Sequence, residues 1–317
     1  MDKSGIINIA IVDVGINEKL YNTGCLDFNL EISPELAIRR RSAYNAFSPS
    51  HGTTCAAIIK RYSPEARLGS IKILNDSSKR AGKYQFITAL EWCAENGIKL
   101  VNLSLGTVDF RDFEEIRDCV NKTAERGLLI VAACNNKNIY TVPSCLTNAI
   151  GVRCRRIYTD AQYRFIPYSF DGIDVEASGR HFLTDVSGNS RYTSPVNSFA
   201  APLITAMVHN VLERAPDMTL EEIKKEIYQN ALNYKGDDDY NPYLCMNTDW
   251  MRGHSGKQKK IWSPEHYKLH LPERMPAKQQ DIDIPVIAVY DTESGDVFDR
   301  FNLLFYKEGY YSVKIVN

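Results

Sequence analysis

Four short segments bring an acid, a base, an amide and a hydroxyl to the boundaries of predicted elements. Asp13 follows the apolar run Ile-Ala-Ile-Val, His51 begins a helical pattern of small residues, Asn135 follows Ile-Val-Ala-Ala-Cys, and Ser198 begins Ser-Phe-Ala-Ala-Pro. A carboxylate directly after a buried strand is held by hydrogen bonds in a dry place, which suits it to orienting a histidine. A hydroxyl at a helix N-terminus lies near positive backbone dipoles, and these favour a developing oxyanion.

Each of these segments, taken alone, also fits an ordinary structural role. Many α/β folds end a strand with aspartate, and His51, followed by Gly52, also suits a helix cap or a surface histidine. Asn135 alone fits a turn, and Ser198 alone fits a serine N-cap. The proline four residues after Ser198 stands early in the expected helix, where its missing N–H costs little. A shared chemistry therefore depends on the four residues meeting in space.

The elements that would position these residues alternate along the first two thirds of the chain. Short apolar runs predict buried parallel strands at Ile6–Val12, Arg67–Leu74, Leu100–Leu105 and Leu128–Ala133. Helical patterns between them predict helices at Thr53–Arg61, Gln85–Glu95 and Phe113–Arg126. This alternation predicts an α/β fold with a mostly parallel sheet flanked by helices. Functional groups of such sheets lie just beyond the carboxyl ends of the strands, where Asp13 and Asn135 stand.

Two further helices are expected before the texture of the chain changes. One covers Phe199–Arg214, and the next begins near Thr219, where Thr-Leu-Glu-Glu is a capping-box pattern. We interpret residues 1–233 as one domain and residues 234–317 as a small C-terminal β extension. Its strands are expected at Ile284–Tyr290, Phe298–Tyr306 and Tyr310–Val316.

Together, these segments resemble the subtilase family of serine peptidases. Asp13 matches the family's strand-end Asp-x-Gly, His51 its His-Gly-Thr, and Ser198 its Ser-Met-Ala-x-Pro, which is Ser-Phe-Ala-Ala-Pro here. The chain order Asp, His, Ser is the subtilase order and differs from the orders of chymotrypsin and the α/β-hydrolases. The segments Asn102–Gly106 and Ile173–Gly179 resemble lesser landmarks of the family.

The resemblance implies a three-layer subtilisin-like fold and a serine endopeptidase that works through an acyl-enzyme. His51 would take the proton of Ser198, and Asp13 would fix the imidazole tautomer. The Asn135 side chain and the Ser198 backbone N–H would hold the oxyanion of the tetrahedral intermediate. Removing such a donor lowers kcat on the order of 10² to 10³-fold, a magnitude that comes from subtilisin itself.

The same resemblance implies where a peptide or protein substrate would lie. The backbone of Ser104, Leu105 and Gly106 would pair with an extended substrate as an added strand. Ala133 and Cys134 would help to wall the primary specificity pocket. Because Cys134 stands where the family usually has glycine, its side chain is expected to narrow that pocket.

The sequence departs from the family pattern at two further places. Val196-Asn197 precedes the nucleophile where Gly-Thr is usual, which leaves the catalytic atoms in place and predicts altered specificity. The interval between His51 and the strand that begins at Arg67 is too short for the calcium-binding insertion of many secreted members. We therefore expect no metal site there and no cofactor. Cys55, one helical turn after His51, is interpreted as a packed small side chain.

The bulk composition excludes several other classes of protein. The 317 residues include 38 basic and 39 acidic ones, a formal net charge of −1, so capture of nucleic acid or an anionic membrane is not expected. Lys257–Lys260 is the most basic run and is interpreted as a solvated loop. No apolar run reaches membrane-spanning length. The eight cysteines show no paired spacing, which favours free thiols and a cytoplasmic protein.

A narrow specificity follows from these expectations as a hypothesis. Only a dozen residues precede Asp13, so an inhibitory propeptide is not expected, and an unrestrained cytoplasmic protease would be hazardous. A processing protease that removes leader peptides from ribosomally made, modified peptides fits this reasoning. The alternative from another class is a catalytically weakened, protease-like module that binds peptides. Peptide ligation by the same acyl-enzyme is a third hypothesis.

Overall fold

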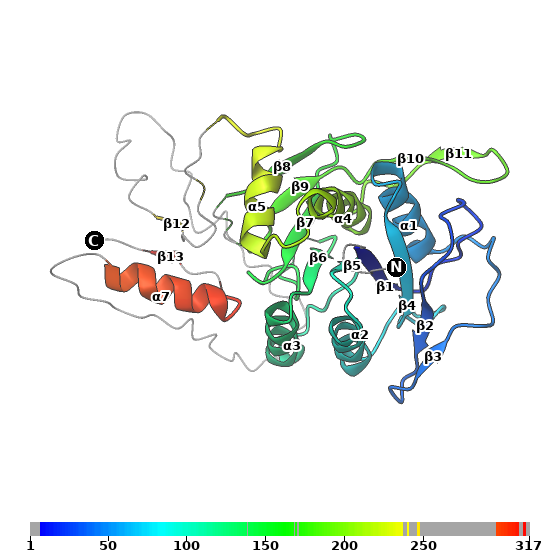
Figure 1. The fold of residues 1–317 in the computed structure, drawn as a ribbon, viewed down its shortest axis with the longest axis horizontal. Coiled ribbons are helices and arrows are strands. Elements are labelled where there is room, and N and C mark those ends of the chain that lie inside the picture. The colour runs from blue at the N-terminus through cyan, green and yellow to red at the C-terminus, as the bar shows by residue number, and fades with distance from the viewer. Residues whose placement is uncertain are drawn as a thin grey trace.

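A nine-stranded, mostly parallel sheet lies at the centre of the computed structural model (Figure 1). The structure describes residues 7–236 except 138, 168 and 170, together with 240, 246–247, 296–310 and 313–314. The strand order is β3-β2-β4-β1-β5-β6-β7-β9-β8, and only the outermost strands β3 and β8 pair antiparallel. The strands are β1 Asn8–Asp13, β2 Asn29–Ile32, β3 Ile38–Arg40, β4 Arg67–Lys72, β5 Leu100–Leu103, β6 Leu129–Ala133, β7 Ile150–Cys154, β8 Tyr163–Phe165 and β9 Val175–Ala177.

Helices cover both faces of this sheet, because its central strands are apolar on both sides. Along β1, Ile9 and Ile11 join one buried cluster, while Ala10 and Val12 join the other. The first cluster includes α1 (His51–Tyr62), α4 (Asn197–Arg214) and α5 (Leu220–Gln229). The second includes α2 (Lys83–Glu95) and α3 (Phe113–Glu125), the latter preceded by the 3-10 turn Phe110–Asp112. The outcome is a three-layer α/β architecture, as the sequence predicts.

The predicted elements of the first 230 residues are confirmed, with boundaries that shift by a few residues. The four predicted strands are β1, β4, β5 and β6, and the predicted helices are α1 to α5. The capping box before α5 is present, since Thr219 Oγ1 accepts from Glu222 N and the Glu222 carboxylate accepts from Thr219 N at 2.8 Å. A short hairpin of β10 (Phe182–Thr184) and β11 (Ser190–Tyr192) leads toward α4.

The expectation of a β extension at the C-terminus is wrong at its middle segment. Residues Phe298–Tyr306 lie in a helix, α7 (Asp296–Lys307), not in a strand. Its buried residues Asn302 and Tyr306 are four residues apart, which is helical spacing, and α7 ends just before Gly309, whose φ of +86° no longer fits a helix. Aromatic residues favour strands, but this period decides the helix.

The other two predicted C-terminal strands have different outcomes. Ile284–Tyr290 lies outside the described residues, as does the basic run Lys257–Lys260. Within Tyr310–Val316, only the two-residue strand β13 (Val313–Lys314) is described, and it pairs parallel with β12 (Met246–Asn247). Among the described residues, no helix combines the length and the hydrophobicity of a membrane span.

Candidate active site

The fold brings the four residues singled out by the sequence to one edge of the sheet. Asp13 is the last residue of β1, and Asn135 follows the end of β6 by two residues. His51 is the first residue of α1, and Ser198 is the second residue of α4. Because β1, β5 and β6 run parallel, their carboxyl ends meet at this edge, and the N-termini of α1 and α4 point to it.

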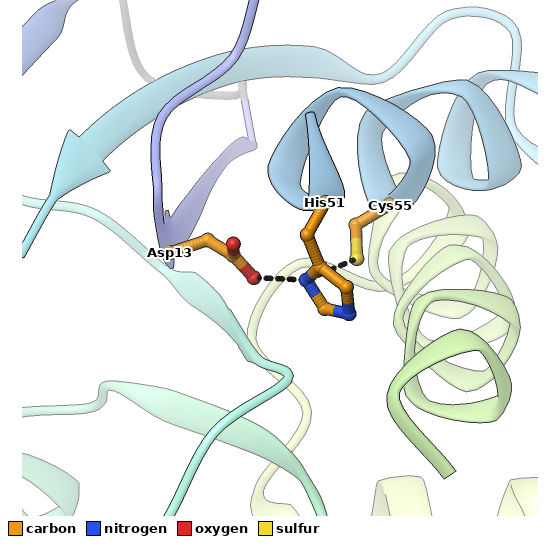
Figure 2. A group of neighbouring side chains, drawn as sticks. All are labelled: Asp13, His51 and Cys55. Carbon is orange, nitrogen blue, oxygen red and sulfur yellow. Dashed lines mark hydrogen bonds and ion pairs between the residues drawn. The ribbon is translucent and has the colours of Figure 1, made fainter. Parts of the chain in front are cut away.

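Asp13 and His51 are joined by a hydrogen bond of 2.8 Å between Oδ2 and Nδ1 (Figure 2). The carboxylate is fully buried, and its Oδ1 accepts from Val14 N at 2.7 Å. An ionised carboxylate only accepts, so Nδ1 carries the proton and Nε2 is left with a lone pair. Gly52 allows the start of α1 to lie this close to the end of β1, since a Cβ on Gly52 would meet Gly15 O at 2.8 Å.

Cys55 is the third side chain of this cluster, one turn along α1 from His51 (Figure 2). Its Sγ lies 3.9 Å from His51 Nδ1 and 3.4 Å from Ser104 Oγ. Burial of the imidazole lowers its pKa, but the Cys55 sulfur and the Asp13 carboxylate outweigh burial, so the pKa of His51 lies above its ordinary value. Asp13, His51 and Cys55 thus form one unit, in which the carboxylate and the sulfur together raise the pKa of the imidazole.

Ser198 lies beside this unit, at the N-terminal turn of α4. Its hydroxyl donates to Ser104 O at 3.5 Å, the one hydrogen bond of Ser198 Oγ among the described residues. The ring of Phe199, the next residue, stacks on His51 with a centroid distance of 5.2 Å and an interplanar angle of 24°. The nucleophile candidate and the histidine therefore share neighbours, although they are not themselves hydrogen-bonded here.

A proline in α4 gives Ser104 a structural task at this site. Pro202 is the sixth residue of α4, further into the helix than the sequence suggests. Because proline has no backbone N–H, the carbonyl of Ser198 lacks the donor that residue 202 would otherwise supply within the helix. Ser104 Oγ supplies the missing donor at 2.8 Å, and Cys55 Sγ adds a weaker contact at 3.7 Å. The hydroxyl of Ser104 thereby ties the end of β5 to the first turn of α4.

The segment after β6 turns the Asn135 side chain in a defined direction. Asn135 Oδ1 accepts from Lys137 N at 2.8 Å, and Asn135 N donates to Thr141 Oγ1 at 3.0 Å. Since Oδ1 faces its own loop, the Nδ2 group of the same amide points the other way. The Asn135 carbonyl accepts a 2.8 Å bond from Asn197 Nδ2, next to Ser198. The side-chain amide is thus oriented through its Oδ1, and the backbone that carries it is held by Thr141 and Asn197.

The predicted substrate-binding segment continues β5 beyond its last paired residue, Leu103. Ser104 and Leu105 are half-buried, and Gly106 is exposed. An isolated antiparallel bridge between Thr107 and Val142 closes the far end of this segment. A Cβ on Gly106 would meet Val142 O at 2.6 Å, so only glycine fits between the two chains.

The residues predicted to wall the specificity pocket, Ala133 and Cys134, are both buried at the end of β6. Cys134 N donates to Val152 O at 3.0 Å, and burial raises the pKa of its thiol to about 11. Its Sγ lies 3.1 Å from Asn197 Nδ2. The sulfur therefore has a specific polar partner. Val196, the other non-glycine at a family glycine, adopts ordinary extended geometry with φ −125°.

Three residues of this site carried no separate signal in the sequence. The first two are Asn136 and Asn197, which join the loop after β6 to the start of α4, since Asn197 N donates to Asn136 Oδ1 at 3.0 Å. The third is Phe199, which stacks on the imidazole of His51. Asn197 stands out in the sequence only as a departure from the usual Gly-Thr. A search for amides flanking both oxyanion donors would have found the pair.

One group of side chains in the described part of the chain has the composition of a metal site. The ligand atoms of Asp13, His51 and Cys55 lie within 4.8 Å of one another. This nitrogen, oxygen and sulfur set differs from the oxygen-rich shell that calcium prefers. In the region where many secreted relatives carry the calcium insertion, α1 is joined to β4 by residues 63–66 alone.

Comparison with known proteins agrees with this arrangement. Residues 5–249 match the subtilase family. Minor extracellular protease Epr of Bacillus subtilis is 26% identical over 243 residues, which are 72% of this chain and 35% of that protein. Subtilisin BL of Lederbergia lenta is 25% identical over 234 residues, which are 68% of this chain and 85% of that protein. The chain spans only about a third of Epr, so its similarity to that protein covers one part of it.

Two solved structures share the fold at low sequence identity. The Epidermin Leader Peptide Processing Serine Protease (EpiP) from Staphylococcus aureus aligns with a TM-score of 0.56 and 16% identity, over 76% of this chain and 73% of that chain. The nisin leader peptidase NisP from Lactococcus lactis aligns with a TM-score of 0.55 and 17% identity, over 75% of this chain and 86% of that chain. With the match to the family over most of its length, the chain belongs to the subtilase family of serine endopeptidases.

Proposed function

We propose that the chain is an active serine endopeptidase in which Ser198 is the nucleophile and His51 the general base. The observation that carries this proposal is the 2.8 Å bond from His51 Nδ1 to buried Asp13, which leaves Nε2 free as a base beside the N-terminus of α4. In the reactive state, the Ser198 side chain rotates from the Ser104 carbonyl toward Nε2.

The proposed reaction has two balanced halves. Ser198 Oγ attacks the peptide carbonyl carbon while its proton passes to His51 Nε2, and the oxyanion is held by Asn135 Nδ2 and Ser198 N–H. The intermediate collapses to an ester on Ser198, and the leaving amine takes the proton from His51. Water then attacks the ester with His51 again as base, and this releases the acid and the free serine.

The substrate is proposed to bind as an extended chain along Ser104, Leu105 and Gly106. This is supported by the position of these residues beyond the last pair of β5 and by the exposure of Gly106. Ala133 and Cys134 are proposed to line the pocket for the residue before the cut. Asn197, which holds the sulfur of Cys134, would then help to shape that pocket.

A fluorophosphonate serine probe tests the nucleophile directly. We expect labelling of the wild type and no labelling of Ser198→Ala, with no effect of EDTA because no step needs a metal ion. Thr193→Ala and Ser194→Ala, changes at nearby hydroxyls, control for non-specific reaction. Labelling that persists in Ser198→Ala would refute the assignment.

We propose further that the enzyme has narrow specificity and removes leader peptides from precursor peptides in the cytoplasm. The fold that the chain shares with two solved leader peptidases supports the removal of leader peptides. The seven cysteines in the described part of the chain are all free, as a reducing compartment would keep them. We expect cleavage at one site in a cognate precursor peptide and little degradation of casein. Indiscriminate degradation of casein would rule out the narrow specificity.

One observation favours a second candidate, a module that binds peptides without cutting them. The Ser198 hydroxyl lies 3.5 Å from Ser104 O, and no hydrogen bond joins it to His51 among the described residues, so the serine side chain has to rotate before it can react. A well-folded sample that binds a precursor peptide but never reacts with the fluorophosphonate probe would favour this function over catalysis.

A further inference from the structure

Asn197, the residue immediately before Ser198, is the most densely bonded polar side chain near the proposed site. It is the first residue of α4 and is only 5% exposed. An amide buried to this degree loses its hydration, so its position depends on finding protein partners for both its ends. It finds them on two segments, the one that follows β6 and the end of β7.

The Nδ2 group of Asn197 bonds to the segment that carries Asn135. It donates to Asn135 O at 2.8 Å and to Cys134 O at 3.1 Å, with Cys134 Sγ also at 3.1 Å. The Oδ1 atom accepts from Cys154 N, at the end of β7, at 2.8 Å. Since carbonyls only accept and a backbone N–H only donates, these partners determine the orientation of the amide.

Asn136 returns the contact from the opposite side. Its Oδ1 accepts from Asn197 N at 3.0 Å, so a side chain of the loop after β6 caps the first turn of α4. The N-cap residue Val196 has no side-chain acceptor and makes no capping bond. Asn136 thus caps the helix that carries Ser198. In return, Asn197, at the start of that helix, holds the loop that carries Asn136.

We propose that Asn197, together with Asn136, is a positioning residue pair that sets the distance between the two oxyanion donors, Asn135 Nδ2 and Ser198 N–H. This inference rests on the proposed function, because it assumes that these two groups stabilise the oxyanion. The donors belong to separate segments, a loop after β6 and the start of α4. The reciprocal amide bonds join those segments at the residues next to both donors.

The reason for such a link lies in the geometry that oxyanion stabilisation requires. Donors stabilise the developing charge only when they are held in place before the reaction, so that no reorganisation accompanies it. A displacement of about 1 Å in a reacting group lowers the rate by about 100-fold. The buried side chain of Asn197 provides this rigidity, because both ends of its amide are bonded, and Asn136 adds a further bond through its Oδ1.

The test measures the rate constant of inactivation and the binding constant of the fluorophosphonate probe separately. Asn197→Ala is expected to lower the inactivation rate constant by about 10- to 100-fold, with the binding constant changed by less than about threefold. Asn136→Ala, at an exposed residue, is expected to lower the rate constant several-fold, with no more than the small loss of Tm that removal of one helix cap causes. Ile223→Ala, which creates a cavity beneath α5 away from the site, shows how far a general loss of stability alone lowers the rate constant.

A double-mutant cycle with Asn135→Ala decides whether Asn197 acts through the oxyanion donor. Once Asn135 has lost its amide, adding Asn197→Ala is expected to lower the rate by only about twofold more. Fully additive losses, or an equal loss in Ile223→Ala, would overturn the proposal. If Asn197→Ala does not fold, an unchanged rate in folded Asn136→Ala overturns it instead. Failure of the proposed function has a separate signature, since the wild type itself would then remain unlabelled.

Discussion

The histidine of the site is held by two neighbours of different character. Asp13 supplies a buried carboxylate on Nδ1, and Cys55 supplies a sulfur 3.9 Å from the same nitrogen. Phe199 covers one face of the ring, so the imidazole keeps its orientation while its outer nitrogen remains accessible. At this scale, reactivity depends on the few atoms that surround one ring.

Replacing the carboxylate tests the orientation of the ring. Asp13→Asn keeps the shape of the side chain but allows its amide to donate to Nδ1, which favours the wrong tautomer. We expect kcat to fall by about 10⁴-fold. The measurement is the rate of fluorophosphonate labelling or of peptide cleavage, with Asp217→Asn, a surface carboxylate, as the matched control. Activity within tenfold of wild type would contradict the role proposed for Asp13.

The pKa of His51 predicts the pH dependence of the reaction. A base works when neutral, and the pKa of His51 lies above its ordinary value, so kcat/KM is expected to rise with pH through a limb on the alkaline side of 6.5. Cys55→Ala removes one of the groups that raise this pKa and should move the limb to lower pH. Cys93→Ala, at another buried cysteine, should leave the limb in place. An identical limb in all three proteins would exclude the influence of Cys55.

At the scale of elements, the site depends on how α1 and α4 are joined to each other. His181 links them, since its Nδ1 lies 2.9 Å from Tyr62 Oη and its Nε2 lies 2.9 Å from Phe199 O. A carbonyl only accepts, so Nε2 carries the proton and Nδ1 accepts from the tyrosine. The neutral imidazole therefore bridges the helix of His51 and the helix of Ser198.

This bridge makes the stability of the protein sensitive to mild acid. Burial lowers the pKa of His181 to about 4, whereas in the unfolded chain it is about 6.5. Between these values only the unfolded chain binds the proton, so stability is full above about pH 6.5 and is lost as pH falls toward about 4. The loss amounts to about 3 kcal/mol.

Thermal unfolding at a series of pH values measures this effect. His181→Gln is expected to be less stable at neutral pH but to show a flatter dependence of Tm between pH 6.5 and 4. Surface carboxylates affect both proteins equally, so the difference between the two curves isolates the histidine. Parallel curves for the two proteins would exclude His181 as the source.

At the scale of the whole molecule, the C-terminal helix packs against the peptidase fold away from the site (Figure 1). The last carbonyls of α7 accept hydrogen bonds from side chains of that fold, with Thr147 Oγ1 donating to Tyr306 O at 2.6 Å and Asn148 Nδ2 donating to Lys307 O at 3.1 Å. Beneath it, Lys224 Nζ lies 3.1 Å from Asp174 Oδ1, with both side chains buried. We propose that residues 1–233 form the peptidase domain and that residues 234–317 form an extension that helps to cover this ion pair.

The buried ion pair offers a test of that arrangement. Lys224→Met leaves Asp174 buried without its cation and is expected to lower the free energy of unfolding by about 3 to 5 kcal/mol. Lys225→Met, at the exposed neighbour, is the matched control and should change it little. Urea denaturation followed by fluorescence measures both. Because the pair is remote from Ser198, folded Lys224→Met should still react with the fluorophosphonate probe.

The sequence alone predicts the class of fold, four of the nine strands of the sheet, the helices α1 to α5 and the residues proposed to do the chemistry. It could do so because buried parallel strands are uniformly apolar and because Asp13, His51, Asn135 and Ser198 all stand where strands end or helices begin. The C-terminal helix was missed because aromatic residues favour strands, while their helical period is short and sits near the end of the chain.

Which of these groups touch, and what holds them, depends on the packing of the elements in three dimensions. The contact of Asn197 with Cys134, the donor that Ser104 provides to the carbonyl freed by Pro202, and the bridge of His181 join residues far apart in the chain. The physical reason is that a hydrogen bond depends on distances of about 3 Å and on the direction of individual atoms. Residue spacing along a strand or helix carries no information about such distances across elements.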